Sequence, residues 1–571
     1  MVPGGGAMFL NEAFRSSRKI NILPMHHEQA CAMAAEGFTK TSNKPAILSV
    51  TTGPGAINAL NGVHGAYTDS IPMFIVSGQV KRETYGPVNS KKIRQLGDQE
   101  VDIVSMVRKI TKYSKTILNI DDLDETLETA YNEMITGRKG PVWIDVPIDI
   151  QSTNIKSKRF SNVKIPNPTF DLKLEKFYNL LKKSNKPVVV VGSGVRLSES
   201  QDLLIKFIEK FNIPIVTTFN SHDLISSDHR LYVGRQGTIG DRSGNFAVEN
   251  ADLLLILGSR MNIRQIGYNF KSFSKNSKKI MVDIDNAELN KHTLKIDLKI
   301  LSDLNYFLSS ALKLKEYKND RQKLYLDWSK DLQKKYELLP KKVGTNKKIN
   351  PYNLFHLLNQ YSQKGDIFVT ADGSAAVMSS QTLKIKSEQR LFSNSGAASM
   401  GYGLPAAIGA SVANLNKKII CIEGDGSIQM NIQELATMKS NKLKIKLIII
   451  ENGGYLSIKQ TQERFFNGNY IACGPDSGLG FPNLSSLCEG YGLNYSYCDT
   501  YEDTEKAFIN YLNNNKQHVF IISVDRNQQF EPKPSSKRLS DGTMVSLPLD
   551  DLYPFLPKKE LEDIRKEAEK I

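Results

Sequence analysis

Short apolar runs, each followed by a glycine-containing turn and an amphipathic stretch, recur along the whole chain. This rhythm is typical of parallel α/β layers, in which buried strands alternate with helices. The runs have the length of strands rather than of helices. We expect strands within residues 45–50, 72–78, 141–147, 187–194, 214–219, 251–260, 279–285, 366–373, 418–427 and 446–455.

The runs gather in three blocks, and each block predicts one α/β domain with a doubly wound parallel sheet. A linker rich in Ser, Asn, Lys and Pro at 151–168 separates the first two blocks, a composition that argues against packing. A Lys- and Tyr-rich helical connector at 316–336 precedes the third block. The expected domains are 1–155, 170–315 and 347–530, followed by a C-terminal tail at 531–571 with an exposed segment and a final helix.

Composition and charge narrow the class of protein. The 571 residues are 40% hydrophobic and 24% charged, which is ordinary for a soluble globular protein. The net charge is +15, but the lysines are interleaved with acidic residues, so we expect no nucleic-acid partner. The five cysteines form no CxxC pair, and no apolar run has the length of a membrane helix. We therefore expect a cytoplasmic protein without a membrane segment.

The strongest chemical signal is a pair of polar loops in the third block. Residues 424–427 (GDGS) end one apolar run and residues 452–454 (NGG) end the next, 27 residues from Asp425 to Asn452. The carboxyl ends of parallel strands share one sheet edge, where ligands bind and helix N-termini face anions. Oxygens of Asp425, Asn452 and the Gly454 carbonyl suit Mg²⁺, which commonly bridges diphosphate oxygens. Each loop alone is an ordinary turn, but the pair favours a metal and diphosphate site lined by Gly424, Gly426 and Ser427.

This pair resembles the thiamine diphosphate and magnesium motif of the thiamine diphosphate-dependent enzymes, in which GDG is followed at this spacing by NN. Here the doublet is Glu451-Asn452, so the ligating Asn is retained. Further segments resemble the acetolactate synthase branch of that family, in the expected order along nearly the whole chain. They are VPGGG (2–6), TTGPGAIN (51–58), AYTDSIPMFIVSGQV (66–80), DQEVDIV (98–104), PVWIDVPIDIQ (141–151), ASMGYGLPAAIGA (398–410) and GDGSIQMNIQELATM (424–438).

The resemblance implies roles for the three domains and for single residues. The first domain would bind the coenzyme's pyrimidine, the central one FAD or another nucleotide, and the third the diphosphate. In the family, a Glu in an HEQ segment hydrogen-bonds the pyrimidine and activates the coenzyme, and here that residue is Glu28. Met400 resembles the apolar residue that keeps the coenzyme bent, Gln99 resembles an active-site glutamine, and Gly53-Pro54-Gly55 resembles a loop near the cofactor. Each of these residues also has an ordinary structural interpretation when taken alone. Glu28 is then an acid at a helix N-terminus, Met400 a core residue and Gln99 a helix cap, and Gly53-Pro54-Gly55 is a turn.

The middle block resembles the FAD-holding domain of acetolactate synthase through residues 233–260 and 282–289. An adenine dinucleotide would be contacted at the ends of its strands. A GSG without the third glycine is a weak fingerprint, and some relatives keep this domain without flavin or use a different nucleotide, so both readings stay open. The expected contact residues are Gly192, Gly194, Arg260, Asp283 and Asp285.

The chain departs from acetolactate synthases on the acceptor side. Those enzymes place Met and Trp five and nine residues after the metal Asn, where this chain has Ser457 and Thr461, and Asp98 replaces the Phe usual before Gln99. Smaller and polar side chains enlarge and hydrate a pocket. We therefore expect a 2-keto acid donor such as pyruvate and a larger, hydroxyl-rich carbonyl acceptor, for example a nucleotide-linked keto sugar. The variant also resembles synthase-like proteins of surface-polysaccharide pathways.

Several alternatives accompany this hypothesis. Two are enzymatic, a simple 2-keto acid decarboxylase and an acyl transferase to phosphate, and one is a degenerate subunit that binds cofactor or partners without turnover. The chain begins in the VPGGG loop, so we expect the first sheet to lack the leading strand that family members usually have. In the family, pyrimidine and diphosphate domains of different chains meet. The resemblance therefore implies a homodimer or homotetramer, with Glu28 and Asp425 of one site supplied by different chains.

Overall fold

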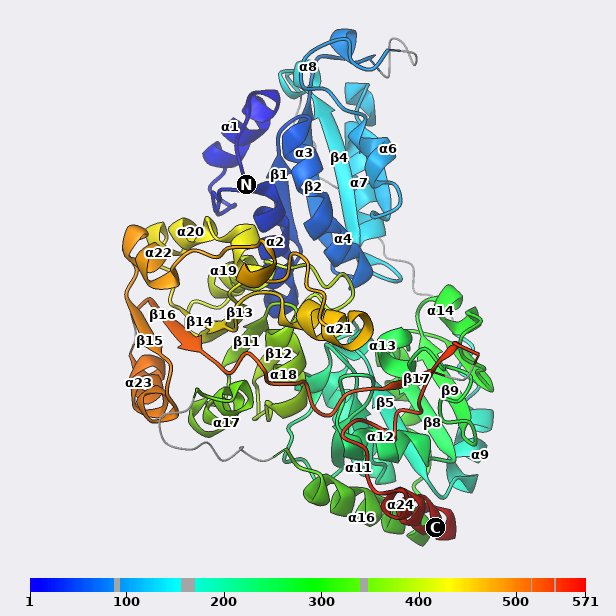
Figure 1. Ribbon diagram of the computed structural model, residues 1–571. Coiled ribbons are helices and arrows are strands. Elements are labelled where there is room, and N and C mark those ends of the chain that lie inside the picture. Colours follow the sequence, from blue (N-terminus) through cyan, green and yellow to red (C-terminus); the bar gives the residue numbers. More distant parts are fainter. Residues whose placement is uncertain (87–92, 156–169, 339–347, 515, 539–540) are drawn as a thin grey trace. The chain divides into compact units, whose positions relative to one another are not determined.

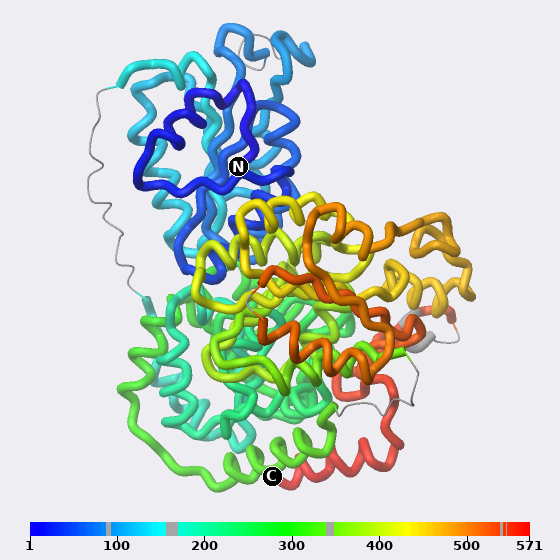
Figure 2. The backbone as a smooth tube through the Cα atoms, turned by 90° about the vertical axis from the view of Figure 1, so that its left-hand side faces the viewer, coloured from blue at the N-terminus to red at the C-terminus, as the bar shows by residue number. Residues whose placement is uncertain are grey.

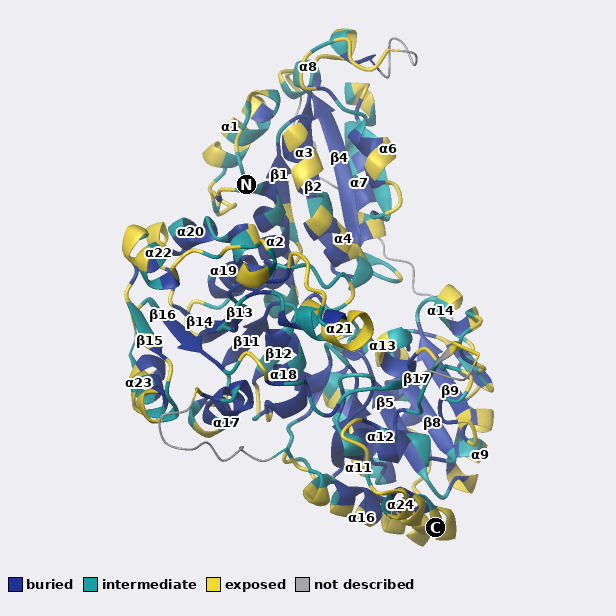
Figure 3. Cartoon of the chain, in the orientation of Figure 1, coloured by how far each residue is buried: buried dark blue, intermediate teal, exposed yellow. Residues whose placement is uncertain are grey.

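The computed structural model describes residues 1–86, 93–155, 170–338, 348–514, 516–538 and 541–571, so most of the linker expected at 151–168 lies outside the described residues. The chain forms two compact units. Unit 1 comprises the described residues of 1–167, 366–375 and 393–523, and unit 2 those of 168–365, 376–392 and 524–571. Strands occur in all ten segments where the hydrophobic pattern predicts them, and most strand residues are buried (Figure 3).

The first sheet of unit 1 has four described parallel strands in the order β1-β2-β4-β3. Their bounds are Ala46–Val50 (β1), Met73–Gln79 (β2), Tyr113–Thr116 (β3) and Pro141–Pro147 (β4). β4 is buried at every residue, as expected for a parallel strand covered on both faces. The accompanying helices include α2 (Glu28–Ser42), α3 (Pro54–Asn58), α4 (Leu60–Thr68) and α7 (Leu123–Ile135) (Figure 1).

The second sheet of unit 1 carries the loops with the strongest chemical signal. Five of its parallel strands follow one another as β11-β13-β14-β16-β15. In the register of β13 and β14, Gly424 pairs with Ile450, so both strands end at the same edge. The bounds are Ile367–Thr370 (β11), Ile419–Gly424 (β13), Ile445–Glu451 (β14), Tyr495–Cys498 (β15) and His518–Ser523 (β16), with helices Gly403–Ala413 (α19), Glu434–Ser440 (α20), Leu456–Phe466 (α21), Leu484–Gly490 (α22) and Tyr501–Asn513 (α23).

Helices α2 and α19 lie side by side and join the two sheets within unit 1 (Figure 1). Glycines allow the close approach. A Cβ on Gly37 would lie 2.1 Å from the Ala406 carbonyl oxygen, and one on Gly409 would lie 1.8 Å from the Ala34 carbonyl oxygen. Any side chain at either position would therefore collide with the facing backbone.

A buried polar cluster fixes the same pair of helices. The Tyr402 hydroxyl donates to Glu36 Oε1 at 3.0 Å, and Lys40 forms ion pairs with Glu36 at 2.6 Å and with Asp69 at 2.9 Å. The Lys40 ammonium also donates to the Ser393 carbonyl at 2.7 Å. Buried charges are tolerated only when they are paired and hydrogen-bonded. This cluster therefore specifies how α2 packs against the third domain.

Unit 2 contains a six-stranded parallel sheet in the order β10-β9-β8-β5-β6-β7. β5 is first in the chain, with β6 on one side and β8 on the other, so the strand order reverses between β5 and β8. Ligands of doubly wound sheets bind outside the carboxyl ends of strands at such a reversal. The bounds are Pro187–Val191 (β5), Ile215–Thr217 (β6), Tyr232–Arg235 (β7), Leu253–Leu257 (β8), Lys278–Asp283 (β9) and Leu298–Leu301 (β10). The three doubly wound α/β sheets predicted from the sequence are thus confirmed.

The C-terminal segment packs onto unit 2. Helix α24 (Lys558–Lys570) lies beside α16 (Asp320–Lys335), and Glu560 pairs with Lys335 at 2.8 Å (Figures 1 and 2). Residues 530–536 are buried or half-buried rather than exposed as expected, because the main chain here is hydrogen-bonded: Gln381 Nε2 donates to the Pro532 carbonyl at 2.6 Å. Among the described residues, no helix combines the length and the apolar character that a bilayer crossing needs.

Candidate active site

The loops that follow β13 and β14 are joined through one carboxylate. Asp425 is 3% exposed and accepts backbone N–H groups from Gly426 at 2.8 Å, Asn452 at 3.1 Å and Gly453 at 2.7 Å. The Gly454 N–H also donates to it, at 3.2 Å. Burial raises the pKa of Asp425 to about 6 against the opposing effect of these donors. A cation bound at Asp425 would favour the charged form of its carboxylate.

Asn452 and Gly454 complete the set of hard oxygen atoms at this edge. The Asn452 amide is buried, and its Nδ2 donates to Ser374 Oγ at 3.2 Å, which fixes the amide plane. Gly454 has φ 117° and lies so close to the Cys473 carbonyl that a Cβ would come within 2.5 Å of it. The Gly454 carbonyl accepts the Leu456 N–H at 3.1 Å.

This donor set suits Mg²⁺ rather than a softer metal. Among the described residues, no three His, Cys, Asp or Glu side chains gather in a possible metal site. One carboxylate with amide and carbonyl oxygens is the pattern of a cation that keeps waters and binds phosphate oxygens. A Cβ on Gly424 would meet nothing within 4 Å, so the space beside this loop is open. The residues therefore fit a magnesium–diphosphate group.

Ser427 ties this loop to the segment that carries Met400. The Gly401 N–H donates to Ser427 Oγ at 2.9 Å, and Gly401 has φ 78°, a conformation that favours glycine. Met400 is half-buried. Gly426 lies against the Tyr455 ring, where a Cβ would come within 2.6 Å. Gly426 is thus required for close packing of the two loops.

Glu28 begins α2 and is 8% exposed. His27 caps the helix, since its Nδ1 accepts the Gln29 N–H at 3.0 Å. Asn58 Nδ2 donates to Glu28 Oε2 at 3.1 Å, and a Cβ on Gly55 would lie 3.0 Å from Glu28 Oε1. The carboxylate is therefore oriented by Asn58 and faces the loop of Gly53, Pro54 and Gly55.

The same loop touches the main chain of Gln99. A Cβ on Gly53, whose φ is 60°, would lie 1.9 Å from the Gln99 carbonyl oxygen. Gln99 itself has φ 61° and is exposed. Its neighbour Glu100 is buried and holds the turn by accepting the Leu96 N–H at 2.6 Å and the Gly97 N–H at 2.7 Å. Gln99 and Glu28 thus approach the same loop, at Gly53 and at Gly55 respectively.

A chain of amides links the Glu28 end of α2 to the Met400 segment. Gln29 Nε2 donates to Asn431 Oδ1 at 3.4 Å, and Asn431 Nδ2 donates to the Gly401 carbonyl at 2.8 Å. Ser399 Oγ donates to Asn61 Oδ1 at 2.8 Å, so both neighbours of Met400 are held. The elements that carry Glu28 and Asp425 therefore contact each other within one chain, whereas the resemblance implies a pairing between chains.

The predicted nucleotide contacts of unit 2 lie at the carboxyl edge of its sheet. Gly192 and Gly194 follow β5. A Cβ on Gly192 would lie 2.3 Å from the Gly258 carbonyl oxygen, and a Cβ on Gly194 would lie 2.7 Å from the Gly258 Cα. These glycines are therefore already required by packing against the loop after β8. Arg260 in that loop is half-buried. After β9, Asp283 accepts the Asp285 N–H at 2.9 Å, and Asp285 caps α14 (Asn286–Asn290).

Several partners of these residues were not evident from the sequence. Asn58 lies in a motif that drew attention only through its glycines, and Ser374 follows a predicted strand without any motif of its own. At the start of α20, Glu434 accepts the His26 N–H at 3.1 Å. Such partners become visible only when segments far apart in the sequence are brought together.

The chain has three parallel-sheet domains, and two of them are joined beside the loops 424–427 and 452–454, which suit Mg²⁺ and a diphosphate. This combination defines a class of coenzyme-dependent α/β enzyme. Three models of the thiamine pyrophosphate enzyme family match the chain. They are the N-terminal TPP binding domain at residues 1–106, the central domain at 174–311 and the C-terminal TPP binding domain at 372–524.

Curated relatives agree with these matches. The acetolactate synthase large subunit of Lactococcus lactis is 34% identical over 503 residues, covering 87% of this chain and 84% of the relative. The chloroplastic acetolactate synthase of Arabidopsis thaliana is 33% identical over 507 residues, covering 86% and 73%. The chain therefore belongs to the thiamine diphosphate (pyrophosphate) enzymes of the acetolactate synthase type. The structure of benzoylformate decarboxylase from Polynucleobacter necessarius, at 20% identity and a TM-score of 0.79, covers 92% of this chain and 96% of its own and shows the shared fold.

Proposed function

We propose that the protein uses thiamine diphosphate and Mg²⁺ to decarboxylate a 2-keto acid, pyruvate in the first place, and to join the acyl group to a carbonyl acceptor larger than a second pyruvate. When bound, thiamine diphosphate supplies the nucleophilic carbon that adds to the keto acid and stabilises the charge left after loss of CO₂. The observation that carries the proposal is the joining of the loops 424–427 and 452–454 through Asp425. Family membership favours this enzyme over a degenerate cofactor-binding subunit.

In this proposal, the chain's own residues bind, orient and move a proton. Asp425, Asn452 and the Gly454 carbonyl hold Mg²⁺, and the Asp425 hydrogen bonds keep the two loops in one geometry. Glu28 shares a proton with the pyrimidine of the coenzyme and is oriented by Asn58. Met400 supports the bend of the coenzyme. Gly424, Gly426 and Ser427 line the diphosphate, and Gly53, Pro54, Gly55 and Gln99 border the pyrimidine side.

Helix α21 supports a large, polar acceptor. Ser457 is half-buried, with its Oγ 3.7 Å from the Cβ position of Gly373, and Thr461 is exposed one turn further on. Residues at i, i+4 and i+7 share a helix face, so Arg464 continues this stripe outward by about 10 Å from Ser457. This face of α21 therefore offers the hydroxyls of Ser457 and Thr461 near the loops 424–427 and 452–454, and the cation of Arg464 beyond them. A hydroxyl-rich carbonyl compound with a distant anionic group, such as a nucleotide-linked keto sugar, matches that order.

The donor and acceptor are tested by incubating the protein with ¹³C-labelled pyruvate, alone or with a nucleotide-linked keto sugar. Mass spectrometry should detect a two-carbon addition to the sugar. Acetolactate as the sole product in both reactions would eliminate the sugar acceptor, whereas accumulation of acetaldehyde would indicate a decarboxylase. Acetyl phosphate, whose formation needs phosphate and a two-electron oxidant such as O₂ in the reaction, would indicate an acyl transferase. Omitting Mg²⁺ after chelation should abolish each reaction.

We also propose that unit 2 binds an adenine dinucleotide such as FAD at the carboxyl edge of its sheet, near Gly192, Gly194, Arg260 and Asp283. Support comes from three buried polar atoms at this edge that lack a hydrogen-bond partner among the described residues, namely His222 Nε2, Thr238 Oγ1 and Asn262 Oδ1. Such atoms cost free energy unless a ligand or water satisfies them. Mass spectrometry of the denatured protein identifies any nucleotide that co-purifies.

A homodimer or homotetramer located in the cytoplasm is proposed from the family resemblance. Co-expression of Glu28→Gln and Asp425→Asn chains tests how the site is assembled. If sites form between chains, a hybrid contains one intact site and regains activity. If each site forms within one chain, the hybrid stays inactive. Light scattering gives the oligomer size.

A further inference from the structure

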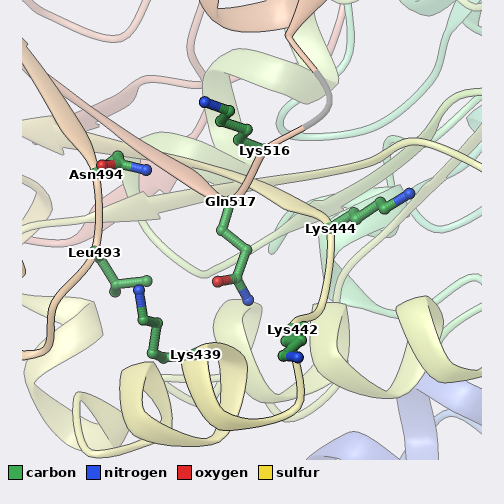
Figure 4. A pocket seen from close by; sticks show the side chains of 7 residues that line it. All are labelled: Lys439, Lys442, Lys444, Leu493, Asn494, Lys516 and Gln517. Atoms are coloured by element: carbon green, nitrogen blue, oxygen red, sulfur yellow. The ribbon is translucent and has the colours of Figure 1, made fainter.

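A hollow of about 250 Å³ lies at the amino-terminal edge of the third domain's sheet (Figure 4). The residues around it come from the turns that precede three adjacent strands and from the end of α20. β14 runs from Ile445 to Glu451, so the hollow lies about 20 Å from the loops 424–427 and 452–454, which are at the opposite edge of the sheet. The polar lining residues are Lys439, Lys442, Lys444, Asn494, Lys516 and Gln517.

The charge of this hollow is entirely positive. It is lined by four lysines and no Asp or Glu, and none of the four forms an ion pair within the described part of the chain. Lys439 donates to the Gly492 carbonyl at the lip. Lys446, in the strand that follows Lys444, is buried and donates to Asn514 Oδ1 at 2.7 Å and to the carbonyl of the lining residue Lys516 at 3.4 Å. Burial, and to a lesser extent the positive charge of Lys418, lowers the pKa of Lys446 to about 8.

Secondary structure explains only part of this cluster. Lys439 is in the last turn of α20, where a cation stabilises the helix dipole. Lys442, Lys444 and Lys516 lie beyond that helix and are exposed. Like charges around one hollow repel each other, so the cluster lowers stability unless an anion occupies it.

The lining also determines the kind of anion. Gln517 Nε2 donates to the Met438 carbonyl, and its side chain extends into the hollow toward Lys439 and Lys442, while Lys444 and Lys516 extend outward (Figure 4). Ammonium groups on flexible stems reach phosphate oxygens as point charges. The volume is just below that of drug-sized ligand sites. It suits a compact group with several charges rather than an extended polymer.

We propose that this hollow is a binding site for a compact polyphosphate, such as a free triphosphate or the triphosphate group of a nucleotide, distinct from the diphosphate motif at the other sheet edge. Lys439 and Lys442 would contact the anion from below, and Lys444 and Lys516 would fold over it. The proposal does not depend on which acceptor the enzyme uses.

The test uses the full-length protein saturated with thiamine diphosphate and Mg²⁺, so that the diphosphate motif is filled. Calorimetric titration with inorganic tripolyphosphate, added as its Mg²⁺ complex in the same Mg²⁺-containing buffer, should show saturable binding of one ion per chain. The triple variant Lys442→Ala/Lys444→Ala/Lys516→Ala should bind at least tenfold more weakly, and the corresponding triple Arg variant should retain binding. ATP as a second probe distinguishes a nucleotide from a free polyphosphate.

A matched variant controls for net charge. Lys271→Ala/Lys275→Ala/Lys278→Ala removes three exposed lysines of unit 2 and should leave affinity unchanged. Without tripolyphosphate, the unfolding midpoint of the first variant should stay the same or rise, because repulsion is relieved, whereas a purely structural role would lower it. Three outcomes would overturn the proposal. The first is equal affinity of the wild type and the first variant for tripolyphosphate, and the second is an equal loss of affinity in the control variant. The third is lysine-dependent binding of an oligonucleotide that is tighter than the binding of tripolyphosphate.

Discussion

The Gly453 N–H donates to Asp425 Oδ2 at 2.7 Å, from the loop after one strand to the loop after its neighbour. The bond exists because Gly424 is in register with Ile450, which brings the ends of β13 and β14 together. The carboxylate thus holds in one geometry the two loops to which we assign the diphosphate. Preorganisation of this kind lowers the cost of binding the coenzyme.

Replacing Asp425 with Asn should disrupt both this geometry and the proposed magnesium site. An amide presents an N–H group to backbone donors that need an acceptor, at a cost of about 1–3 kcal/mol. We expect thiamine diphosphate with Mg²⁺ to raise the unfolding midpoint of the wild type but not of this variant. Asp499→Asn, an exposed acid of the same domain, should respond like the wild type. A normal ligand-induced shift in Asp425→Asn would exclude Asp425 as a metal ligand.

Glu28→Gln should separate coenzyme binding from turnover. The amide oxygen can still accept the Asn58 hydrogen bond, so the helix start and the coenzyme-induced stabilisation should persist. Pyruvate consumption should fall by roughly 10²–10⁴-fold, the usual contribution of a positioned acid or base. Glu12→Gln changes an exposed acid paired with Arg15 and serves as the control. Unchanged pyruvate consumption would remove Glu28 from the catalytic assignment.

The local part of the fold could be predicted from the sequence, whereas contacts between distant segments could not. Strand β4 coincides with the predicted run 141–147, because a strand covered on both faces is continuously apolar. β3 (Tyr113–Thr116) was not predicted, since it is short and only half-buried at each residue. β16 (His518–Ser523) was also missed, although its apolar run is visible in the sequence.

The candidate site shows the same division. Asp425 and Asn452 were found together because their loops end adjacent strands of one βα unit. The packing of Gly37 against Ala406 and the orientation of Glu28 by Asn58 depend on tertiary contacts that no local pattern encodes. The lysines of the hollow were likewise interpreted as scattered surface charge, because Lys516 is distant in sequence from Lys439.

Gly409→Ala should weaken the seating of α2 on α19. The added methyl would lie 1.8 Å from the Ala34 carbonyl oxygen, so the helices must separate, at a cost of about 1–3 kcal/mol. We expect a lower unfolding midpoint and weaker coenzyme affinity. Gly490→Ala is the matched control, since a Cβ there meets nothing within 4 Å. Equal midpoints for the two variants would argue against a role of the close helix contact.

Ser457→Met combined with Thr461→Trp should change the acceptor preference. The larger apolar groups fill the face of α21 that the proposal assigns to a polar acceptor, and a pocket of this kind discriminates by fit and by hydrogen-bond partners. We expect the ratio of acetolactate to sugar product to rise at least tenfold in a competition assay analysed by mass spectrometry. Ile458→Met, on an exposed position of the same helix, should leave the ratio unchanged.

Asp145 should make the stability of the first domain depend on pH. It is fully buried in β4 and accepts hydrogen bonds from Ser77 Oγ at 2.6 Å, Gln79 Nε2 at 3.1 Å and Thr116 Oγ1 at 3.2 Å. Burial outweighs these donors and raises the pKa of Asp145 from 3.8 to about 7. Between these values the folded state binds a proton that the unfolded state releases, so the free energy of unfolding falls as pH rises.

The variant Asp145→Asn removes this titration and should therefore gain stability relative to the wild type between pH 4 and pH 8, by on the order of 2–4 kcal/mol. Trp143 is a suitable reporter, because its Nε1 donates to the same Ser77 hydroxyl at 2.8 Å. The chain has two tryptophans, so a Trp328→Phe background restricts the fluorescence signal to this domain. Urea unfolding of both proteins in that background, measured at several pH values, gives the difference directly. A difference that stays constant across this range would show that Asp145 is charged in the folded protein throughout.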